Sequence, residues 1–128
     1  MVPSYDPALN LVYTGTSVAS PAPKFMLGGV DNKHLYHNST LALDGDTGDI
    51  VWTNAADGFS DASFAPTSAV PGLVFIGSVI EKGVRIYDSA TGEKLATPKV
   101  GFGIASAPAI VDGTVILGHG QGELGPNP

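Results

Sequence analysis

Cysteine is absent from this chain of 128 residues, so disulfides, thiolate metal sites and a cysteine nucleophile are excluded. Basic side chains are scarce, because 6 Lys and Arg stand against 12 Asp and Glu, and they are not clustered. Binding of nucleic acid requires basic side chains that neutralise phosphates, and we therefore expect no nucleic-acid partner. No apolar run approaches the ~20 residues of a membrane-spanning helix, and residues 1–6 have neither the basic nor the apolar region of a signal peptide. The sequence predicts no membrane span and no signal peptide.

Helical periodicity is missing as well. No window of about 11 residues carries apolar side chains at helical spacing without an interrupting Gly or Pro. The 17 Gly and 10 Pro suit short strands that are joined by tight turns. Apolar residues make up 43% of the chain and charged residues 14%, which excludes disorder and is enough for one hydrophobic core. The predicted fold class is all-β.

Two similar stretches, 41–52 and 84–96, each contain an apolar strand, a turn with the pattern Asp-x-x-Thr-Gly and a second strand. Asp side chains bond nearby backbone N–H groups and Gly accepts positive φ, so each stretch predicts a β-hairpin. The leading residues, Asp44 and Asp88, are 44 residues apart, which fits one propeller blade of ~40–50 residues. We expect antiparallel four-stranded blades centred on the hairpins, with less than about a tenth of the chain in helices. Alternation around the turns predicts burial of Leu41, Leu43, Ile50, Trp52, Val74, Ile76, Ile86 and Leu95.

The chain divides into units by the spacing of these patterns. Residues 1–61 form a first blade unit with an inserted loop at 17–38, and residues 62–100 form a second unit. Residues 101–118 have the opening of a third blade only, and residues 119–128 read as a flexible tail. A propeller closes with ~4–8 blades, so two and a half blades predict an incomplete propeller. Its open blade edges predict self-association.

Several stretches resemble one enzyme family. The Ala-Leu-Asp-x-x-Thr-Gly-x-x-x-Trp pattern at 42–52 resembles the tryptophan-docking repeat of the dehydrogenases that use pyrroloquinoline quinone (PQQ). Residues 5–16 and 20–44 are similar to blade openings of the alcohol dehydrogenases of that family, and residues 104–113 to later openings. The resemblance implies a quinoprotein-type propeller that oxidises a small-molecule alcohol or sugar with PQQ and calcium. It also implies a periplasmic or extracellular location.

The same resemblance points to individual site residues. Thr16 and Asn38 are the candidates for cofactor binding, and Asp57 and Asp61 the candidates for the catalytic base. In methanol-dehydrogenase-like members, an Asn after the strand coordinates the calcium beside PQQ. Here Val18 stands at that place, and Val cannot coordinate a hard cation, so we assign no metal ligand. We therefore expect weak or absent oxidation of alcohols by the isolated chain.

Three other patterns have a structural and a functional interpretation. The acidic stretch 44–49 could be a calcium loop, but an EF-hand needs a Glu at its twelfth position, and a hairpin turn is favoured. His34 and His37 beside Asp31 could hold a metal on a helical turn, although a solvated loop is favoured. Trp52 could stack on a cofactor, but its place in the repeat favours docking of one blade on the next.

Two classes of function remain open at this point. The chain can be a fragment or derivative of a PQQ-dependent alcohol or sugar dehydrogenase, with PQQ and calcium as its cofactors. It can instead be a non-catalytic blade module for binding or self-assembly, which would need no cofactor. Fold alone does not decide between them.

Overall fold

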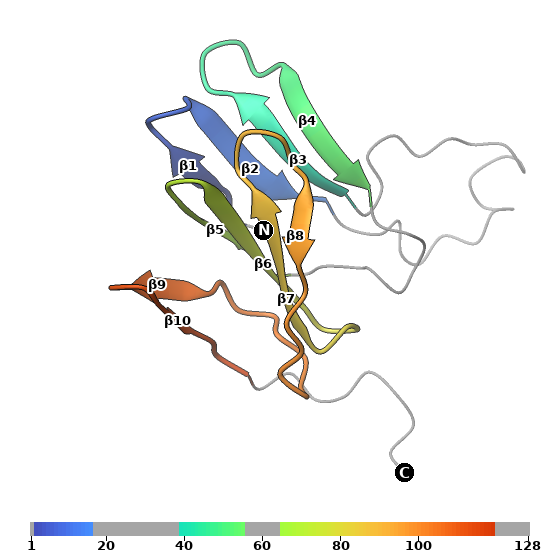
Figure 1. The fold of residues 1–128 in the computed structure, drawn as a ribbon. Coiled ribbons are helices and arrows are strands. Elements are labelled where there is room, and N and C mark those ends of the chain that lie inside the picture. The colour runs from blue at the N-terminus through green and yellow to red at the C-terminus, as the bar shows by residue number, and fades with distance from the viewer. Residues whose placement is uncertain (1, 17–38, 56–64, 120–128) are drawn as a thin grey trace, which may run out of the picture.

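The computed structural model describes residues 2–16, 39–55 and 65–119. These ranges contain ten β-strands and no helix (Figure 1). The strands are β1 (Ser4–Asp6), β2 (Leu11–Gly15), β3 (Ser39–Asp44), β4 (Ile50–Ala55), β5 (Thr67–Val70), β6 (Leu73–Ser78), β7 (Gly83–Asp88), β8 (Lys94–Ala96), β9 (Ala109–Val111) and β10 (Thr114–Ile116). Accordingly, no membrane-crossing helix is found in the part of the chain that the structure describes.

The strands form three antiparallel sheets, in the orders β1-β2-β3-β4, β5-β6-β7-β8 and β10-β9. The first strand of each sheet lies beside the first strand of the next, so that β1, β5 and β9 follow one another (Figure 1). Side chains join these strands, because the Ser4 hydroxyl donates to Thr67 Oγ1 at 2.9 Å and the Ser68 hydroxyl donates to the Pro108 carbonyl at 2.5 Å. The described sheets do not close into a ring. This arrangement confirms the predicted all-β fold of four-stranded blades in an incomplete propeller.

Two hydrophobic clusters hold the sheets together. The cluster between the first and second sheets consists of Leu11, Tyr13, Ala42, Trp52, Ala65, Val74, Ile76 and Tyr87. The cluster between the second sheet and the β9–β10 pair consists of buried Phe75, Val84 and Ile104 with half-buried Val70, Leu73, Ile86, Val100, Ile110 and Leu117. Because successive side chains of a strand point to opposite faces, β6 contributes Val74 and Ile76 to the first cluster and Phe75 to the second. The second sheet is therefore apolar on both faces.

Both Asp-x-x-Thr-Gly turns form the predicted hairpins. The carboxylate of Asp44 accepts two backbone N–H groups of its own turn at 2.9 Å each, and that of Asp88 accepts two at 2.8 and 2.9 Å. Gly48 and Gly92 close the turns with φ of 76° and 74°, a backbone conformation that other residues adopt only with strain. The backbone hydrogen bonds stabilise the charged carboxylates and lower the pKa of both Asp44 and Asp88. The leading Asp of each motif thus stabilises its hairpin turn, as the hairpin interpretation of the sequence predicts.

The predicted core is correct in part. Four of the eight side chains are buried, namely Leu41, Trp52, Val74 and Ile76, and two are half-buried, namely Leu43 and Ile86. The prediction is wrong for Ile50 and Leu95, which are 39% and 50% exposed. Both lie on the outermost strand of their sheet, opposite a β-bulge that shifts the register of pairing. The prediction assumed that side chains alternate between the two faces of the sheet from the turn onward, and a β-bulge interrupts this alternation.

Candidate functional site

Thr16 directly follows β2 and binds the first residue of β3. Its N–H donates to the Ser39 carbonyl at 2.7 Å, and its hydroxyl donates to the same oxygen at 3.2 Å and accepts the Ser39 N–H at 2.7 Å. Gly15 and Thr40 form the last pair of the ladder beside this contact. The hydroxyl that the sequence assigned to the cofactor therefore closes one end of the first sheet.

The other predicted site residues lie outside the described residues, namely Val18, Asp31, His34, His37, Asn38, Asp57 and Asp61. The described chain nevertheless fixes where their segments attach. β4 ends at Ala55, and Ala55 pairs with Ser39, the residue that follows segment 17–38. Ala55 is also the residue that precedes segment 56–64. Both segments thus join the first sheet at the end where Thr16 lies.

A buried cation lies at the equivalent end of the second sheet. Arg85 on β7 is 2% exposed, and its Nε donates to Glu81 Oε2 at 2.6 Å while its Nη2 donates to Ser78 Oγ at 3.3 Å. The other Glu81 oxygen lies 3.7 Å from Lys99 Nζ. Arg85 shares a face of β7 with Tyr87, which packs between the two sheets. Arg85 was not predicted from the sequence. The sequence does contain a signal for a buried ion pair, because Arg85 lies on the inward face of an apolar strand four residues after Glu81.

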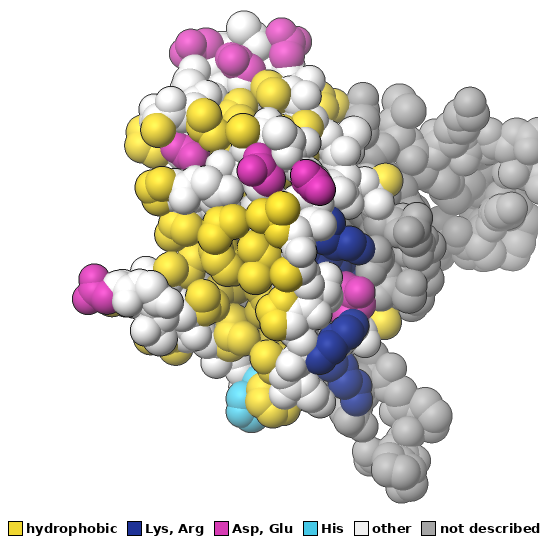
Figure 2. Space-filling model, viewed as in Figure 1, with side chains coloured by type: hydrophobic (Ala, Val, Ile, Leu, Met, Phe, Trp, Pro, Cys, Tyr) yellow, Lys and Arg dark blue, Asp and Glu magenta, His cyan; other side chains and the backbone are white. Residues whose placement is uncertain are grey.

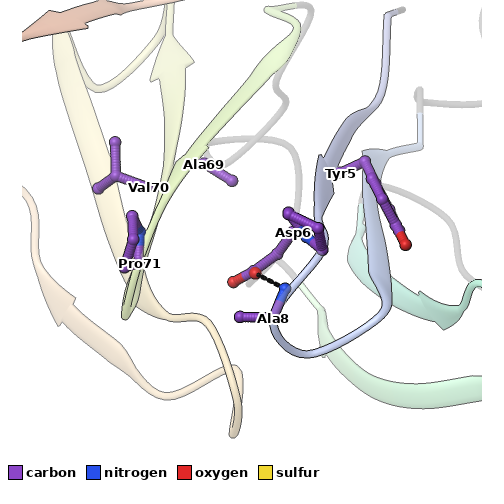
Figure 3. A pocket seen from close by; sticks show the side chains of 7 residues that line it. Tyr5, Asp6, Ala8, Ala69, Val70 and Pro71 are labelled. Carbon is purple, nitrogen blue, oxygen red and sulfur yellow. Dashed lines mark hydrogen bonds between the residues drawn. The ribbon is translucent and has the colours of Figure 1, made fainter.

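A cavity of about 230 Å³ lies at the opposite end of the sheets. It separates the β1–β2 turn from the β5–β6 turn and is lined by Tyr5, Asp6, Pro7, Ala8, Ala69, Val70 and Pro71 (Figure 3). The Asp6 carboxylate accepts the Ala8 N–H at 2.8 Å, which shapes the first of these turns. Asp6 pairs with Leu11, at the far end of β2 from Gly15. Thr16, the predicted site residue within the described ranges, does not line this cavity.

The first two sheets are joined at one backbone carbonyl, that of Ser89. Trp52 Nε1 donates to it at 3.0 Å and the Tyr13 hydroxyl donates to it at 3.1 Å. The Trp52 ring covers Gly92, where an added Cβ would lie 2.5 Å from ring atoms, and Asn54 Nδ2 donates to the Gly92 carbonyl at 3.1 Å. Burial raises the pKa of Tyr13, so the hydroxyl stays a donor. Trp52 therefore docks the first blade on the hairpin turn of the second.

Solved structures with the same arrangement of strands are quinoprotein dehydrogenases. The chain superposes on the quinohemoprotein alcohol dehydrogenase of Pseudomonas putida with a TM-score of 0.64 and 25% sequence identity, over 94% of this chain. The chain therefore has a quinoprotein-like propeller fold. A europium-containing methanol dehydrogenase matches 83% of the chain with a TM-score of 0.59 and 20% identity. The quinohemoprotein alcohol dehydrogenase of Comamonas testosteroni matches 88% of it with a TM-score of 0.55 and 21% identity.

The quinoprotein resemblance seen in the sequence is thus confirmed at the level of fold. The chain covers 22%, 21% and 20% of the three solved structures, so it spans about a fifth of their length. No protein-family model matches the chain, and no curated protein matches it in sequence. The assignment therefore depends on the structure and on the short motifs around the hairpins.

Within residues 2–16, 39–55 and 65–119, no three His, Cys, Asp or Glu side chains lie close enough together to hold a metal ion. Calcium takes ~6–8 oxygen ligands, and the Thr16 hydroxyl is already bonded to Ser39. His119 stacks on Phe102 with ring centres 4.4 Å apart.

Proposed function

We propose that the chain is a segment of a PQQ-dependent alcohol or sugar dehydrogenase, to which it contributes adjacent propeller blades. The structural match over 94% of the chain to a quinohemoprotein alcohol dehydrogenase is the observation that carries this proposal. The proposed cofactors are PQQ and calcium, and the proposed location is periplasmic or extracellular. The substrate in this proposal is a small alcohol or sugar.

In this proposal the role of the two sheets is to hold segments 17–38 and 56–64 at a fixed distance from each other. Both segments attach beside Thr16 and Ser39, and the Ser39–Ala55 pair ties their near ends together. The Trp52 contact with the second hairpin keeps the first sheet from rotating on the second. Asn38 would then contribute to cofactor binding, and Asp57 or Asp61 would act as the base. Rigid elements beneath a site give this kind of positioning.

The second candidate is a non-catalytic blade module that binds or assembles through its open side. The observation that favours it is the apolar face of the second sheet, where Leu73 and Ile86 are only half-buried and Ala96 is exposed. Apolar surface of this kind on a repeat protein is normally covered by a neighbouring repeat.

Thermal unfolding of the full chain with PQQ and calcium tests the first function against the second. A ligand that binds only the folded chain raises its stability by RT ln(1 + [L]/Kd), so we expect a higher unfolding temperature that increases with PQQ concentration. Asn38→Ala should abolish the increase. The matched change Asn10→Ala should preserve it, because Asn10 bonds Asp46 at the other end of the sheet.

Alcohol-dependent reduction of a dye by the isolated chain should be weak or absent. Robust turnover that disappears with Asp57→Ala or Asp61→Ala would contradict that expectation. No stabilisation by PQQ, together with a particle larger than the 13.0 kDa chain in light scattering, would favour the assembly module instead.

A further inference from the structure

The cavity between the β1–β2 turn and the β5–β6 turn has rigid and mostly apolar walls. Pro71 and Gly72 form the second of these turns, in which Gly72 has a φ of 86° and its carbonyl accepts the Ser89 N–H at 3.1 Å. Ala69 on β5 packs against the cluster between the first two sheets, and its methyl group points toward β1 (Figure 3). Because proline also fixes its own φ, this wall is formed before any ligand binds.

One charged group faces these walls, the carboxylate of Asp6 at the end of β1. The residue is 6% exposed, and its Oδ1 accepts the Ala8 and Leu9 N–H groups at 2.8 and 3.4 Å. Its Oδ2 accepts no hydrogen bond from the described residues and points across the cavity toward Pro71 (Figure 3). Withdrawal of a charged carboxylate from water is costly unless a donor or a cation pairs with it. The cavity therefore presents one acceptor to a bound donor.

The described residues supply no cation to this carboxylate. None of the residues that line the cavity is Lys, Arg or His. Figure 2 shows the Lys and Arg side chains of the visible face on the side of the molecule away from the β1–β2 and β5–β6 turns. The chain as a whole has a net charge of −6, which attracts cations from solution. The cation that pairs with Asp6 is thus expected to be a bound one.

The geometry of the carboxylate discriminates between kinds of cation. Its Oδ1 is occupied by the turn, so a guanidinium group cannot bind both oxygens in the bidentate manner that favours it. A calcium ion needs ~6–8 oxygen ligands, whereas the cavity offers one free carboxylate oxygen among apolar side chains. An ammonium group is a compact charge that can bind a single oxygen. Pro7 and Ala8 at the rim are exposed, so the remaining N–H groups of the ammonium stay in contact with water.

We propose that this cavity binds a small primary ammonium ion with a short alkyl chain, whose charged end pairs with Asp6 Oδ2 and whose chain lies on Ala69 and Pro71. The volume of about 230 Å³ exceeds the ~150 Å³ of an apolar cavity that holds benzene, so a chain of about four carbons fits. The site lies at the opposite end of the sheets from Thr16. The inference therefore goes beyond the proposed function and does not require PQQ binding.

Titration of the isotope-labelled full chain with n-butylammonium chloride, followed by its backbone amide NMR signals, tests the site. We expect saturable shifts of the Ala8 and Leu9 signals, because both amides bond the Asp6 carboxylate. n-Butanol fits the same walls without the charge, and n-butylguanidinium carries its charge on a planar fork. Each should bind at least fivefold more weakly than n-butylammonium. Sodium chloride at the same ionic strength is the blank.

Three variants locate the bound ion. Asp6→Asn keeps an oxygen for the Ala8 N–H but removes the charge and places an amide donor in the cavity, so it should weaken binding at least tenfold. Glu93→Gln is the matched control, because it removes the same charge from the exposed turn of the second hairpin, and it should change affinity less than twofold. Ala8→Lys, at an exposed position beside the carboxylate, supplies a tethered ammonium and should block the free one. Far-UV circular dichroism checks that the sheets of each variant are intact.

Saturable binding that Asp6→Asn weakens and Glu93→Gln leaves unchanged would support the proposal. Equal affinities for n-butylammonium and n-butanol would overturn it, because the cavity would then recognise apolar volume alone. Equal weakening by Asp6→Asn and Glu93→Gln would also overturn it, since the attraction would then come from the net charge of the chain. Undiminished binding to the Ala8→Lys chain, or no saturable shift at all, would show that the cavity does not hold the ion.

Discussion

Replacement of Trp52 by Ala should remove most of the energy that docks the first sheet on the second. The side chain is 8% exposed, stacks near Tyr13 and Tyr87 with ring centres 5.8 and 6.4 Å away, and covers Gly92. Loss of a buried Trp side chain, together with its hydrogen bond to Ser89, costs about 3–5 kcal/mol. The Ser89 carbonyl keeps the Tyr13 hydroxyl as a donor at 3.1 Å, so no buried acceptor is left unpaired. We expect a total loss of about 4 kcal/mol, which is a large fraction of a typical stability of ~5–15 kcal/mol.

Urea unfolding followed by far-UV circular dichroism measures this loss without using the tryptophan as the probe. With a urea slope of about 2 kcal/mol per molar, the midpoint should fall by about 2 M. Trp52→Phe keeps an aromatic ring but removes the N–H donor, and should lie between Ala and wild type. Val51→Ala is the control, because the neighbouring Val51 is 51% exposed and should change the free energy by less than about 0.5 kcal/mol. If Trp52→Ala costs no more than Val51→Ala, the contact with the second hairpin does not hold the sheets together, and our account of it is wrong.

Two further predictions concern the hairpin turns. Gly92→Ala should destabilise the chain more than Gly48→Ala. Both glycines have positive φ, but only at Gly92 would the new Cβ lie 2.5 Å from the Trp52 ring. Equal unfolding midpoints of the two variants would show that the ring moves aside freely. Stability should also fall in acid, because the folded pKa of Asp44 and Asp88 lies below the unfolded value: their contribution is complete above the unfolded pKa of about 3.9 and is lost as pH falls through the folded pKa. Urea midpoints measured from pH 6 to pH 2 should show this fall for the wild type and a smaller fall for the chain with both Asp replaced by Asn.

The part of the fold that follows from local sequence is the part that could be predicted. The two hairpins depend on an Asp that binds its own turn and on a Gly with positive φ, both of which are visible in a few consecutive residues. Ile50 and Leu95 were assigned to the core wrongly, because a β-bulge and an outer edge are properties of the assembled sheet.

The candidate site shows the same limit. The family resemblance assigned Thr16 to cofactor binding, but its three hydrogen bonds to Ser39 depend on the pairing of β2 with β3 across segment 17–38. Arg85 was missed because its burial depends on packing of β7 against another sheet, although its Glu81 partner lies only four residues away in the sequence. Docking by Trp52 was expected, but its acceptor at Ser89 could not be, since 37 residues separate the two.

The carbonyl of Ser89 accepts hydrogen bonds from two side chains, Tyr13 and Trp52, and both belong to the preceding blade. The contact between the two blades is therefore not symmetric: Tyr13 and Trp52 of one blade bind the hairpin turn of the blade that follows. When blades are gained, lost or exchanged, the sequence is therefore constrained more at these contacts between blades than inside each blade. On the second sheet, Phe75 and Ala96 occupy the positions that correspond to Tyr13 and Trp52 on the first. Neither side chain can donate a hydrogen bond to a turn that follows. Docking of a blade at that position therefore depends on the packing of apolar side chains rather than on hydrogen bonds from this row of paired residues.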